Sequence, residues 1–453
     1  MSPCIPLLSH RDAREIFAWR DGRPVDVGGF LADVAQVADA MPEGAHVLNA
    51  CHDRYHVAVG FAAAIVRGKL NLLPSTRNAD TVRHLRESAP DLFCLVDGPC
   101  ELQLPQMVYP RTRSAAGAPG LDAIPELSAE RVVARVYTSG STGAPLPHDK
   151  TWGSLVACIR AGRERLGLPP ATTLVGTVPA QHMYGFESTL LMAFHGELAL
   201  SAAHPFYPAD IVGELARVPA PRMLVTTPVH LRALLGSGLD IPPLRMVLCA
   251  TAPLPPALAR QAEARMGAPL VEIYGSTETG QIATRRTATS EAFTLLDGVR
   301  LQPLTEGVAM ASGGHLRSPT PIHDILETLG EARFLLHGRS ADMVNIAGKR
   351  SSLAHLSHQL CAIPGVQDGA FFAPDEIDGD GVARLMAFAV APGTTVQALR
   401  SQLRERIDPA FMPRPLVLLD ELPRNATGKL PHAALAALAV RHGPAWRSDD
   451  DGL

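Results

Sequence analysis

The segment GAHVLNACHDRYHVAVGFAAAIVRG, residues 44–68, joins a short strand to a helix. GAHVLNA is a short apolar run typical of a buried strand, and HVAVGFAAAIVRG is helical. The flanking segments continue the alternation, because GGFLADVAQVADAM carries a helical apolar stripe and DLFCLVDG returns to a strand with a glycine stop. Apolar strands that alternate with amphipathic helices predict an α/β fold with parallel sheets covered on both faces.

The same pattern resumes further along the chain, in ATTLVGTVPA at 171–180, PRMLVTTPVHLRALLGSG at 221–238 and LRMVLCATAPL at 244–254. The strand ends run into Gly, Pro and Thr turns, the place where open α/β sheets bind ligands. After about residue 340 the pattern becomes that of a compact α+β unit. We therefore predict a large N-terminal domain of parallel and mixed sheets over residues 1–338 and a small C-terminal α+β domain over residues 339–453.

The composition limits the classes of function. A chain of 453 residues is too long for one core, and a net charge of −4 argues against nucleic acid as a main partner. The longest apolar run, Val57 to Val66, is much shorter than the roughly 20 residues that cross a bilayer. The first residues show no secretion signal, and seven scattered cysteines without a CxxC pair indicate free thiols. We expect a cytoplasmic protein without membrane insertion.

Two histidines in HDRYH, His52 and His56, have the i, i+4 spacing of a helical metal site. Asp53 stands where the glutamate of HExxH would be, and no third ligand is apparent. A solvated or capping pair is the favoured interpretation of these residues.

The segment VYTSGSTGAP, Val136 to Pro145, has the features of a phosphate-binding loop. Glycines allow the backbone N–H groups to approach an anion closely, and hydroxyl side chains add further donors. The candidate residues are Thr138, Ser139, Gly140, Ser141, Thr142 and Gly143. The loop lacks the GxxxxGK[ST] pattern of a Walker A motif, and alone it is also compatible with an ordinary loop.

Three further motifs follow in order: YGSTE at 274–278, Asp324 with GRSAD at 338–342, and PRNATGK at 423–429. With VYTSGSTGAP they resemble the signatures of the adenylate-forming superfamily of acyl-CoA synthetases, peptide-synthetase adenylation domains and luciferases. The resemblance covers nearly the whole chain. It implies ATP and Mg²⁺ as cofactors and a small, mobile C-terminal lid domain that rotates about a hinge near residues 339–342.

The resemblance assigns the nucleoside site to residues far apart in the sequence. The ring of Tyr274 would lie along the adenine, with Gly275 beside it and the Ala252–Pro253 backbone on the other side. Asp324 would accept hydrogen bonds from the ribose, and Arg339 would bind ribose or phosphate oxygen nearby. Core packing of Tyr274 and a surface ion pair of Asp324 with Arg339 are the alternatives.

The resemblance also assigns the phosphate chemistry. Thr277 would donate to the α-phosphate, and Glu278 would hold Mg²⁺, a hard cation that prefers carboxylate oxygen. A helix cap is the alternative for this Thr–Glu pair. Lys429 would stabilise charge on the reacting carboxylate and α-phosphate, and Arg350 resembles the family arginine that contacts phosphate.

The acid site is expected along PAQHMYGF, Pro179 to Phe186, which resembles the family segment that lines the acyl pocket. His182 would approach the substrate carboxylate, although a lone histidine is often structural. The remaining candidate wall residues are Tyr184, Gly185, Phe186, Thr227, Ala250 and Thr251.

Two positions depart from the family pattern. The lysine that normally follows the phosphate-loop proline is replaced by Leu146, so a cation over the β- and γ-phosphates is missing unless His148 or Lys150 supplies it. Ala341 occupies the position of the usual hinge aspartate, and Asp342 follows it. A hinge tolerates any residue that absorbs a backbone change.

The resemblance implies ATP-dependent activation of a carboxylic acid, with an aromatic acid favoured, and transfer of the acyl group to a thiol. The PLPHDKTW continuation and the short large domain are similar to acid–carrier-protein ligases of aryl-polyene and xanthomonadin-type pigment clusters. An acyl carrier protein is therefore the expected acceptor, and coenzyme A is the alternative. A non-catalytic relative that binds nucleotide or carrier protein is a second alternative, disfavoured by the presence of Glu278, Asp324, Arg339 and Lys429.

Overall fold

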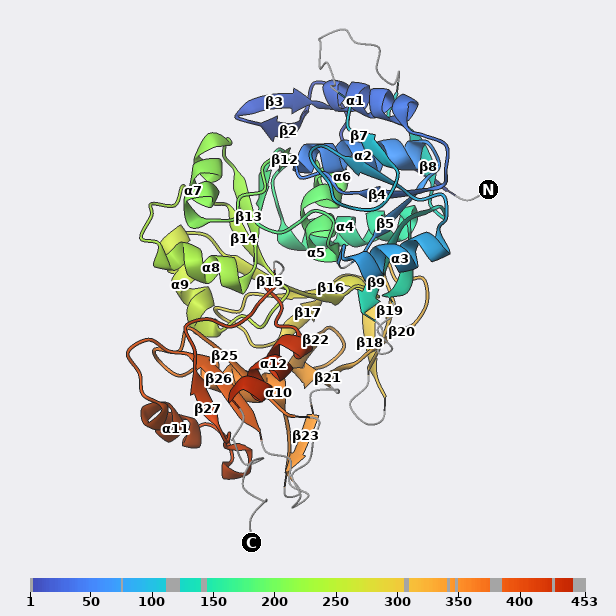
Figure 1. The fold of residues 1–453 in the computed structure, drawn as a ribbon. Coiled ribbons are helices and arrows are strands. Elements are labelled where there is room, and N and C mark those ends of the chain that lie inside the picture. The colour runs from blue at the N-terminus through green and yellow to red at the C-terminus, as the bar shows by residue number, and fades with distance from the viewer. Residues whose placement is uncertain are drawn as a thin grey trace.

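The computed structural model describes residues 3–74, 76–110, 123–139, 145–304, 309–339, 343–346, 349–374, 385–425 and 428–442. The chain forms a large lobe from its N-terminal three quarters and a smaller lobe from its C-terminal part (Figure 1). The expected α/β architecture with a small α+β unit is thereby confirmed.

The first sheet of the large lobe has six strands in the order β10-β9-β5-β4-β6-β7. Strands β9, β5, β4, β6 and β7 run parallel, and β10 pairs antiparallel with β9 at the edge. Their bounds are β4 His46–Asn49, β5 Leu70–Leu73, β6 Phe93–Val96, β7 Gln106–Val108, β9 Val132–Ser139 and β10 Pro145–Thr151.

The second sheet has eleven strands in the order β21-β22-β17-β16-β15-β14-β13-β11-β12-β2-β3. Its centre is parallel from β15 to β2, and both ends are antiparallel. The bounds are β2 Ile16–Arg20, β3 Arg23–Asp26, β11 Thr173–Gly176, β12 Ala199–Ser201, β13 Arg222–Thr226, β14 Met246–Cys249, β15 Leu270–Ser276, β16 Gly280–Arg285, β17 Phe293–Leu295, β21 Asp324–Thr328 and β22 Arg333–Arg339.

The central strands of both sheets are buried on both faces, and their residues alternate between different cores. In β14, Met246 and Leu248 join the central core, whereas Val247 and Cys249 join a second core beneath the outer helices. This alternation follows from the two-residue period of a strand. The central core contains residues of both sheets and of the helices between them. The large lobe is therefore layered, with one helical layer shared by two sheets.

The helices of the large lobe fill these layers. Helices α1, α2, α4 and α6 contribute to the central core, α7, α8 and α9 cover the eleven-stranded sheet, and α3 covers the other side of the six-stranded sheet. Their bounds are α1 Val27–Ala40, α2 Arg54–Val66, α3 Ala79–Ser88, α4 Trp152–Leu166, α5 Met183–Gly185, α6 Met192–His195, α7 Pro208–Arg217, α8 Pro228–Gly236 and α9 Pro256–Met266, with a π-helical turn η1 at Phe186–Leu191.

HDRYH lies at the start of α2, where the capping residue is Asp53 and not one of the two histidines. Asp53 is the N-cap of α2, where its carboxylate accepts from the backbone N–H groups of Tyr55 and His56. His52 and His56 each place Nδ1 near Asp97, at 3.3 Å and 3.0 Å. The two histidines thus share a carboxylate at the start of the helix, and no group of three potential metal ligands occurs among the described residues.

The small lobe has its own cores, built from residues 344–439. Strand β26 alternates between them, because Ala387 and Ala389 face one core and Phe388 faces the other. The strands are β23 Met343–Ile346, β24 Lys349–Ser352, β25 Asp368–Phe372, β26 Met386–Val390 and β27 Leu416–Leu418; the helices are α10 Leu353–Cys361, α11 Val396–Arg404, α12 His432–His442 and a 3₁₀ turn η4 at Pro409–Phe411.

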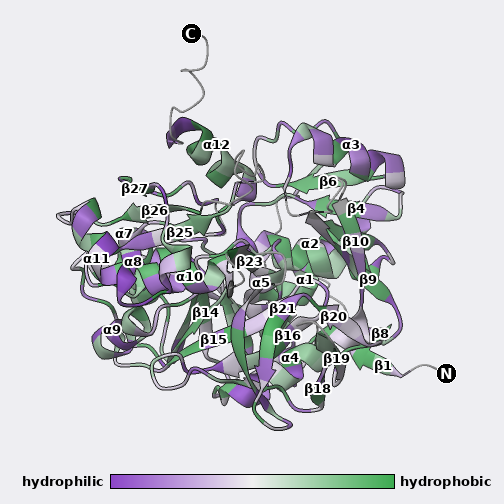
Figure 2. Ribbon diagram, turned by 90° about the horizontal axis from the view of Figure 1, so that it is seen from below, coloured by the Kyte–Doolittle hydropathy of each residue, from purple (hydrophilic) through white to green (hydrophobic). Residues whose placement is uncertain are grey.

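Two small sheets complete the large lobe, β1 Cys4–Pro6 with β8 Glu126–Ser128, and β18 Val299–Pro303 with β19 Ala309–Gly313 and β20 Thr320–Ile322. Apolar residues gather on the inner strands, whereas α3 and α11 carry long hydrophilic stretches (Figure 2). All seven cysteines are free, in agreement with the expected thiols. In the described part of the chain, no helix has the length and apolarity needed to span a bilayer.

Candidate active site

The YGSTE segment forms the turn of a hairpin between β15 and β16. Thr277 and Glu278 lie in the turn itself, so the alternative of a helix cap is wrong. The turn is cross-linked, because the Ser276 N–H donates to Thr279 Oγ1 at 3.1 Å and the Thr279 N–H donates to Ser276 Oγ at 3.2 Å. The sequence therefore presents Thr277 and Glu278 at the tip of a stiff hairpin.

Gly275 is required by this hairpin for steric reasons. A Cβ at this position would lie 2.2 Å from the carbonyl oxygen of Gly280, on the opposite strand. The register between the strands also shifts at Tyr274 and Gly275. A bulge of this kind redirects the residues that follow it, which here are the candidate residues Thr277 and Glu278.

Tyr274 and Asp324, assigned to adenine and ribose, lie together. The Tyr274 hydroxyl donates to Asp324 Oδ2 at 2.5 Å. The Tyr274 ring also packs against Phe293 and Phe334, at centroid distances of 5.5 Å and 5.3 Å, and only 8% of the residue is exposed. The core-packing alternative therefore describes the ring, while the hydroxyl reaches the candidate ribose acceptor. Arg339 is the direct cross-strand partner of Asp324, although its side chain lies outside the described part.

The opposite wall of the candidate nucleoside site follows β14. Ala250 is buried at the end of this strand, and Thr251 has a φ of +83°. A β-branched residue rarely adopts this left-handed conformation, and strained backbone is concentrated at functional sites. Thr251 leads directly into Ala252 and Pro253, the predicted adenine wall, of which Pro253 is exposed.

The candidate phosphate loop connects β9 to β10. Residues 140–144, which include Gly140, Ser141, Thr142 and Gly143, lie outside the described residues, as does the side chain of Ser139. Thr138 lies at the end of β9, and its Oγ1 is 2.9 Å from His148 Nε2. Leu146, the residue in place of the lysine, is the cross-strand partner of Thr138 and is 54% exposed.

Glu278 is the best placed carboxylate for a metal ion. Partial burial raises its pKa, but this is outweighed by a hydrogen bond from its own N–H and one from Ser276, followed by the charges of His148 and Lys150, so the net pKa is lowered. His148 Nε2 lies 3.6 Å from Glu278 Oε1. The side chain is 37% exposed and ionised at neutral pH. An accessible carboxylate beside a hydroxyl-rich turn fits the oxygen preference of Mg²⁺.

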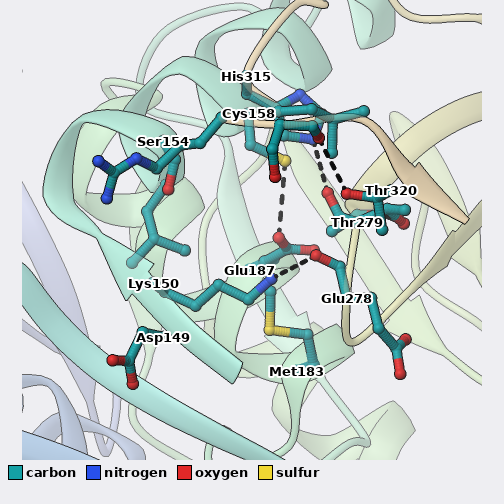
Figure 3. A pocket seen from close by; sticks show the side chains of 15 residues that line it. Asp149, Lys150, Ser154, Cys158, Met183, Glu187, Glu278, Thr279, His315 and Thr320 are labelled. Carbon is teal, nitrogen blue, oxygen red and sulfur yellow. Dashed lines mark hydrogen bonds between the residues drawn. The ribbon is translucent and has the colours of Figure 1, made fainter. Parts of the chain in front are cut away.

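A buried polar cluster lies directly behind this turn, in a cavity of about 130 Å³ (Figure 3). Lys150 Nζ donates to the Glu278 carbonyl at 2.8 Å, and His315 Nε2 lies 2.8 Å from the Thr279 carbonyl. Glu187 faces the same cavity, and Cys158 Sγ is 3.5 Å from Glu187 Oε1. Among the side chains behind the turn, the sequence predictions included only Lys150, as a possible replacement for the missing cation.

One signal in the sequence points to this cluster. Glu187 is the single charged residue in MYGFESTLLMAF, an otherwise apolar run apart from hydroxyls. Buried charges require partners, so such a residue predicts a polar site. Burial raises the pKa of Glu187 to about 7, and the charge of Lys150 opposes this shift. The sequence around His315 contains no comparable feature that would have pointed to this cluster.

The predicted acid-site segment is mostly internal. The Tyr184 hydroxyl donates to the carbonyls of Thr226 and Leu248, at 3.1 Å and 3.0 Å, and Phe186 is 1% exposed. Gly185 packs so closely on Pro179 that a Cβ would lie 2.0 Å from its carbonyl oxygen. These contacts anchor the segment at the carboxyl ends of β13 and β14.

His182 remains partly accessible at the start of this segment. Burial, together with the charges of Arg77 and Lys429, lowers its pKa to about 4. The imidazole is therefore neutral at pH 7. Arg77, which the motifs did not indicate, is thus a further cation near the candidate carboxylate site.

Lys429 comes from the small lobe and approaches the large one. A Cβ on the preceding residue, Gly428, would lie 3.4 Å from Thr227 Oγ1, so this loop contacts the start of α8. The Lys429 N–H donates to Asn425 Oδ1 at 2.9 Å, which closes the loop. Thr227 itself is buried and caps α8. The lobes therefore meet where Lys429 acts electrostatically on His182.

Three further predicted residues, Arg350, Ala341 and Asp342, belong to the C-terminal part of the chain. Arg350 lies in β24 opposite Asn345, and its side chain is outside the described part. The hinge candidates Ala341 and Asp342 lie outside the described residues.

The fold and the site together define an enzyme of the adenylate-forming class. The family model described as AMP-binding enzyme matches residues 40–302, more than half of the chain. A second model, the AMP-binding enzyme C-terminal domain, matches residues 358–429. The chain belongs to this family.

Known proteins resemble the chain in sequence and in fold. A 4-coumarate–CoA ligase of Rhodobacter capsulatus is 33% identical over 273 residues, which span 60% of this chain and 66% of that ligase. ATP-bound MatB from Rhodopseudomonas palustris superimposes with a TM-score of 0.79 at 18% identity, covering 95% of this chain and 97% of that one. The o-succinylbenzoate coenzyme A synthetase MenE of Bacillus subtilis, with ATP and magnesium, gives 0.75 at 18% identity, with coverage of 92% and 95%.

Proposed function

We propose that this enzyme activates a carboxylic acid, with an aromatic acid favoured, by forming an acyl-adenylate from ATP, and then transfers the acyl group to a thiol. The observation that supports the proposal most strongly is the meeting of the two lobes. It brings Lys429 within electrostatic reach of His182. The Tyr274–Asp324 pair, on strands β15 and β21, and the Thr277–Glu278 turn belong to the same lobe as His182. The name of the 4-coumarate ligase relative supports an aromatic acid.

The first step joins the acid carboxylate oxygen to the α-phosphorus of ATP, while the bond from this phosphorus to the pyrophosphate oxygen breaks. Asp324, oriented by Tyr274, holds the ribose, and Thr277 donates to the α-phosphate. Lys429 offsets the negative charge that develops between carboxylate and phosphate. Such steps depend on positioning and charge neutralisation. Glu278 would hold Mg²⁺, which supplies further charge neutralisation at the phosphates.

His182 serves this step as a neutral group. Because its pKa is about 4, it brings no positive charge of its own and can donate one hydrogen bond to the acid carboxylate. The nearby charges of Arg77 and Lys429 attract the substrate anion.

The second step moves the acyl group from AMP to sulfur, with AMP as the leaving group. We propose that the small lobe over residues 339–453 rotates about Ala341 and Asp342, which removes Lys429 and admits the thiol. The phosphopantetheine of an acyl carrier protein is the favoured acceptor, on the resemblance of PLPHDKTW to carrier-protein ligases. Coenzyme A is the second candidate, since the similar curated relative is named a CoA ligase.

ATP–pyrophosphate exchange with a panel of benzoic, hydroxybenzoic, cinnamic and fatty acids tests this proposal. We expect exchange with aromatic acids, and mass spectrometry should then find the acyl group on a holo carrier protein. Transfer to coenzyme A alone would select the second acceptor. Absence of exchange with every acid, despite measurable ATP binding, would favour the non-catalytic relative.

A further inference from the structure

The turn that carries Thr277 and Glu278 is held from its inner side by two buried side chains. Lys150 Nζ donates to the carbonyl of Glu278, and His315 Nε2 lies 2.8 Å from the carbonyl of Thr279, the next residue. Both residues are 8% exposed. Since a carbonyl oxygen only accepts, the proton of His315 is on Nε2 in this arrangement. Two consecutive peptide groups of one short turn are thus fixed by side chains from distant parts of the chain.

Strand β10 explains how Lys150 reaches the turn. Side chains two apart in a strand point to the same face, so Leu146, His148 and Lys150 share one face of β10. Leu146 is exposed, and His148 Nε2 lies 3.6 Å from the Glu278 carboxylate. Lys150 donates to the Glu278 backbone carbonyl. A lysine is absent at Leu146, but Lys150 lies four residues later on the same face of β10. Its ammonium group binds the backbone of the turn.

A buried ammonium group needs a compensating charge, and Glu187 provides it. Glu187 is 3% exposed and faces the same cavity as Lys150 (Figure 3). The charge of Glu187 is the largest influence that favours the protonated form of Lys150 against burial. Glu187 lies in the π-helical turn η1, and such turns are frequent at functional sites.

The cluster also depends on the absence of a side chain at Gly280. This residue has a φ of +69°, and a Cβ would lie 2.7 Å from Glu187 Oε1 and 3.3 Å from Cys158 Sγ. At Gly280 the hairpin therefore packs directly against the side chains of the polar cluster.

We propose that Lys150 and His315 are positioning residues, which hydrogen-bond successive carbonyls and thereby fix the turn that presents Thr277 and Glu278 to Mg·ATP. Their effect is exerted through Glu278, so it should appear in metal-dependent nucleotide binding. This inference rests on the proposed function, because it assumes that the turn binds Mg·ATP.

The test is calorimetric titration of the full-length protein with α,β-methylene-ATP, with and without Mg²⁺. Charge-assisted hydrogen bonds contribute enough for Lys150→Met to weaken binding about ten-fold or more with Mg²⁺. Without Mg²⁺ we expect a change of less than about two-fold. In a Glu278→Gln background, the additional loss from Lys150→Met should also be less than about two-fold, because both changes act on one interaction.

Lys69→Met is the matched control. Lys69 is also a buried lysine, 7% exposed, and its Nζ donates to the Gly44 carbonyl at 2.6 Å, near the amino-terminal ends of β5 and β4. This variant should lower the melting temperature without changing the Mg²⁺ dependence of binding. His315→Leu should reproduce the effect of Lys150→Met, whereas His315→Gln, which keeps an N–H donor, should retain most of the wild-type affinity.

Two results are informative in different ways. If wild-type protein binds the nucleotide and Lys150→Met and His315→Leu bind it equally well, or lose affinity equally with and without Mg²⁺, the positioning role is overturned. If the wild-type protein binds no nucleotide in either condition, the proposed function itself is overturned.

Discussion

At the scale of single residues, the hydrogen bond between Tyr274 and Asp324 joins two motifs that are fifty positions apart. Its consequence is that the candidate ribose acceptor is oriented by the candidate adenine residue. The Tyr274 ring is held in turn by Phe293 and Phe334. The packing of Tyr274 against these two rings therefore fixes the position of the Asp324 carboxylate.

Tyr274→Phe removes this hydrogen bond and keeps the ring. Loss of a hydrogen bond to a charged acceptor predicts an increase in KM for ATP of about ten-fold, with a much smaller change in melting temperature. Tyr109→Phe is the control, because the buried Tyr109 hydroxyl has no hydrogen-bond partner among the residues that the structure describes. Steady-state exchange kinetics would distinguish the two; equal KM values for both variants would show that Tyr274 does not orient Asp324.

The sequence motifs contain the candidate site residues but not the side chains that support them. Tyr274, Thr277 and Glu278 belong to one short motif and Asp324 precedes another, and each side chain has chemistry that suits its assigned ligand. Lys150 lies 128 positions from Glu278, however, and His315 lies 36 positions from Thr279. Contacts at such separations depend on how strands and loops are brought together, which neither periodicity nor composition specifies.

At the scale of elements, the hairpin of β15 and β16 is the part on which the site depends most. Its close approach at Gly275 and its bulge set the direction of the turn. The sequence analysis gave YGSTE as a motif but did not predict the antiparallel hairpin, because a short motif alone does not determine the direction of the following chain.

Gly275→Ala tests this element. A Cβ placed 2.2 Å from the Gly280 carbonyl must displace the opposite strand, at a cost of about 1–3 kcal/mol in the free energy of unfolding. Exchange activity should fall by more than this loss of stability explains. Gly213→Ala in α7 is the control, since no atom lies within 4 Å of its added Cβ and alanine favours a helix. Wild-type exchange in folded Gly275→Ala protein would contradict the account of the hairpin.

The predicted alternation of strands and helices in the large lobe was confirmed because it follows from local patterns. Segments 44–50 and 91–98 contain β4 and β6, and 56–68 overlaps α2. The layering could be predicted for the same reason. A strand such as MVLC is apolar on both faces, so both faces of its sheet must be covered. The π-helical turn around Glu187 was not predicted, because its sequence is compatible with an ordinary helix.

At the scale of the whole molecule, the proposed site lies where the two lobes meet. A Cβ added at Gly428 would lie 3.4 Å from Thr227 Oγ1, and the charge of Lys429 helps to lower the pKa of His182. A lysine on a separate lobe can act in the first step and be withdrawn before the second.

The most direct test of the proposed mechanism is the rate of acid-dependent ATP–pyrophosphate exchange in Lys429→Ala. Loss of a charge that acts on the developing negative charge predicts a decrease of about a hundred-fold or more. Thioester formation from supplied acyl-adenylate should continue, because Lys429 does not take part in that step. Exchange at nearly the wild-type rate in the variant would contradict the central claim that the small lobe supplies the activating cation.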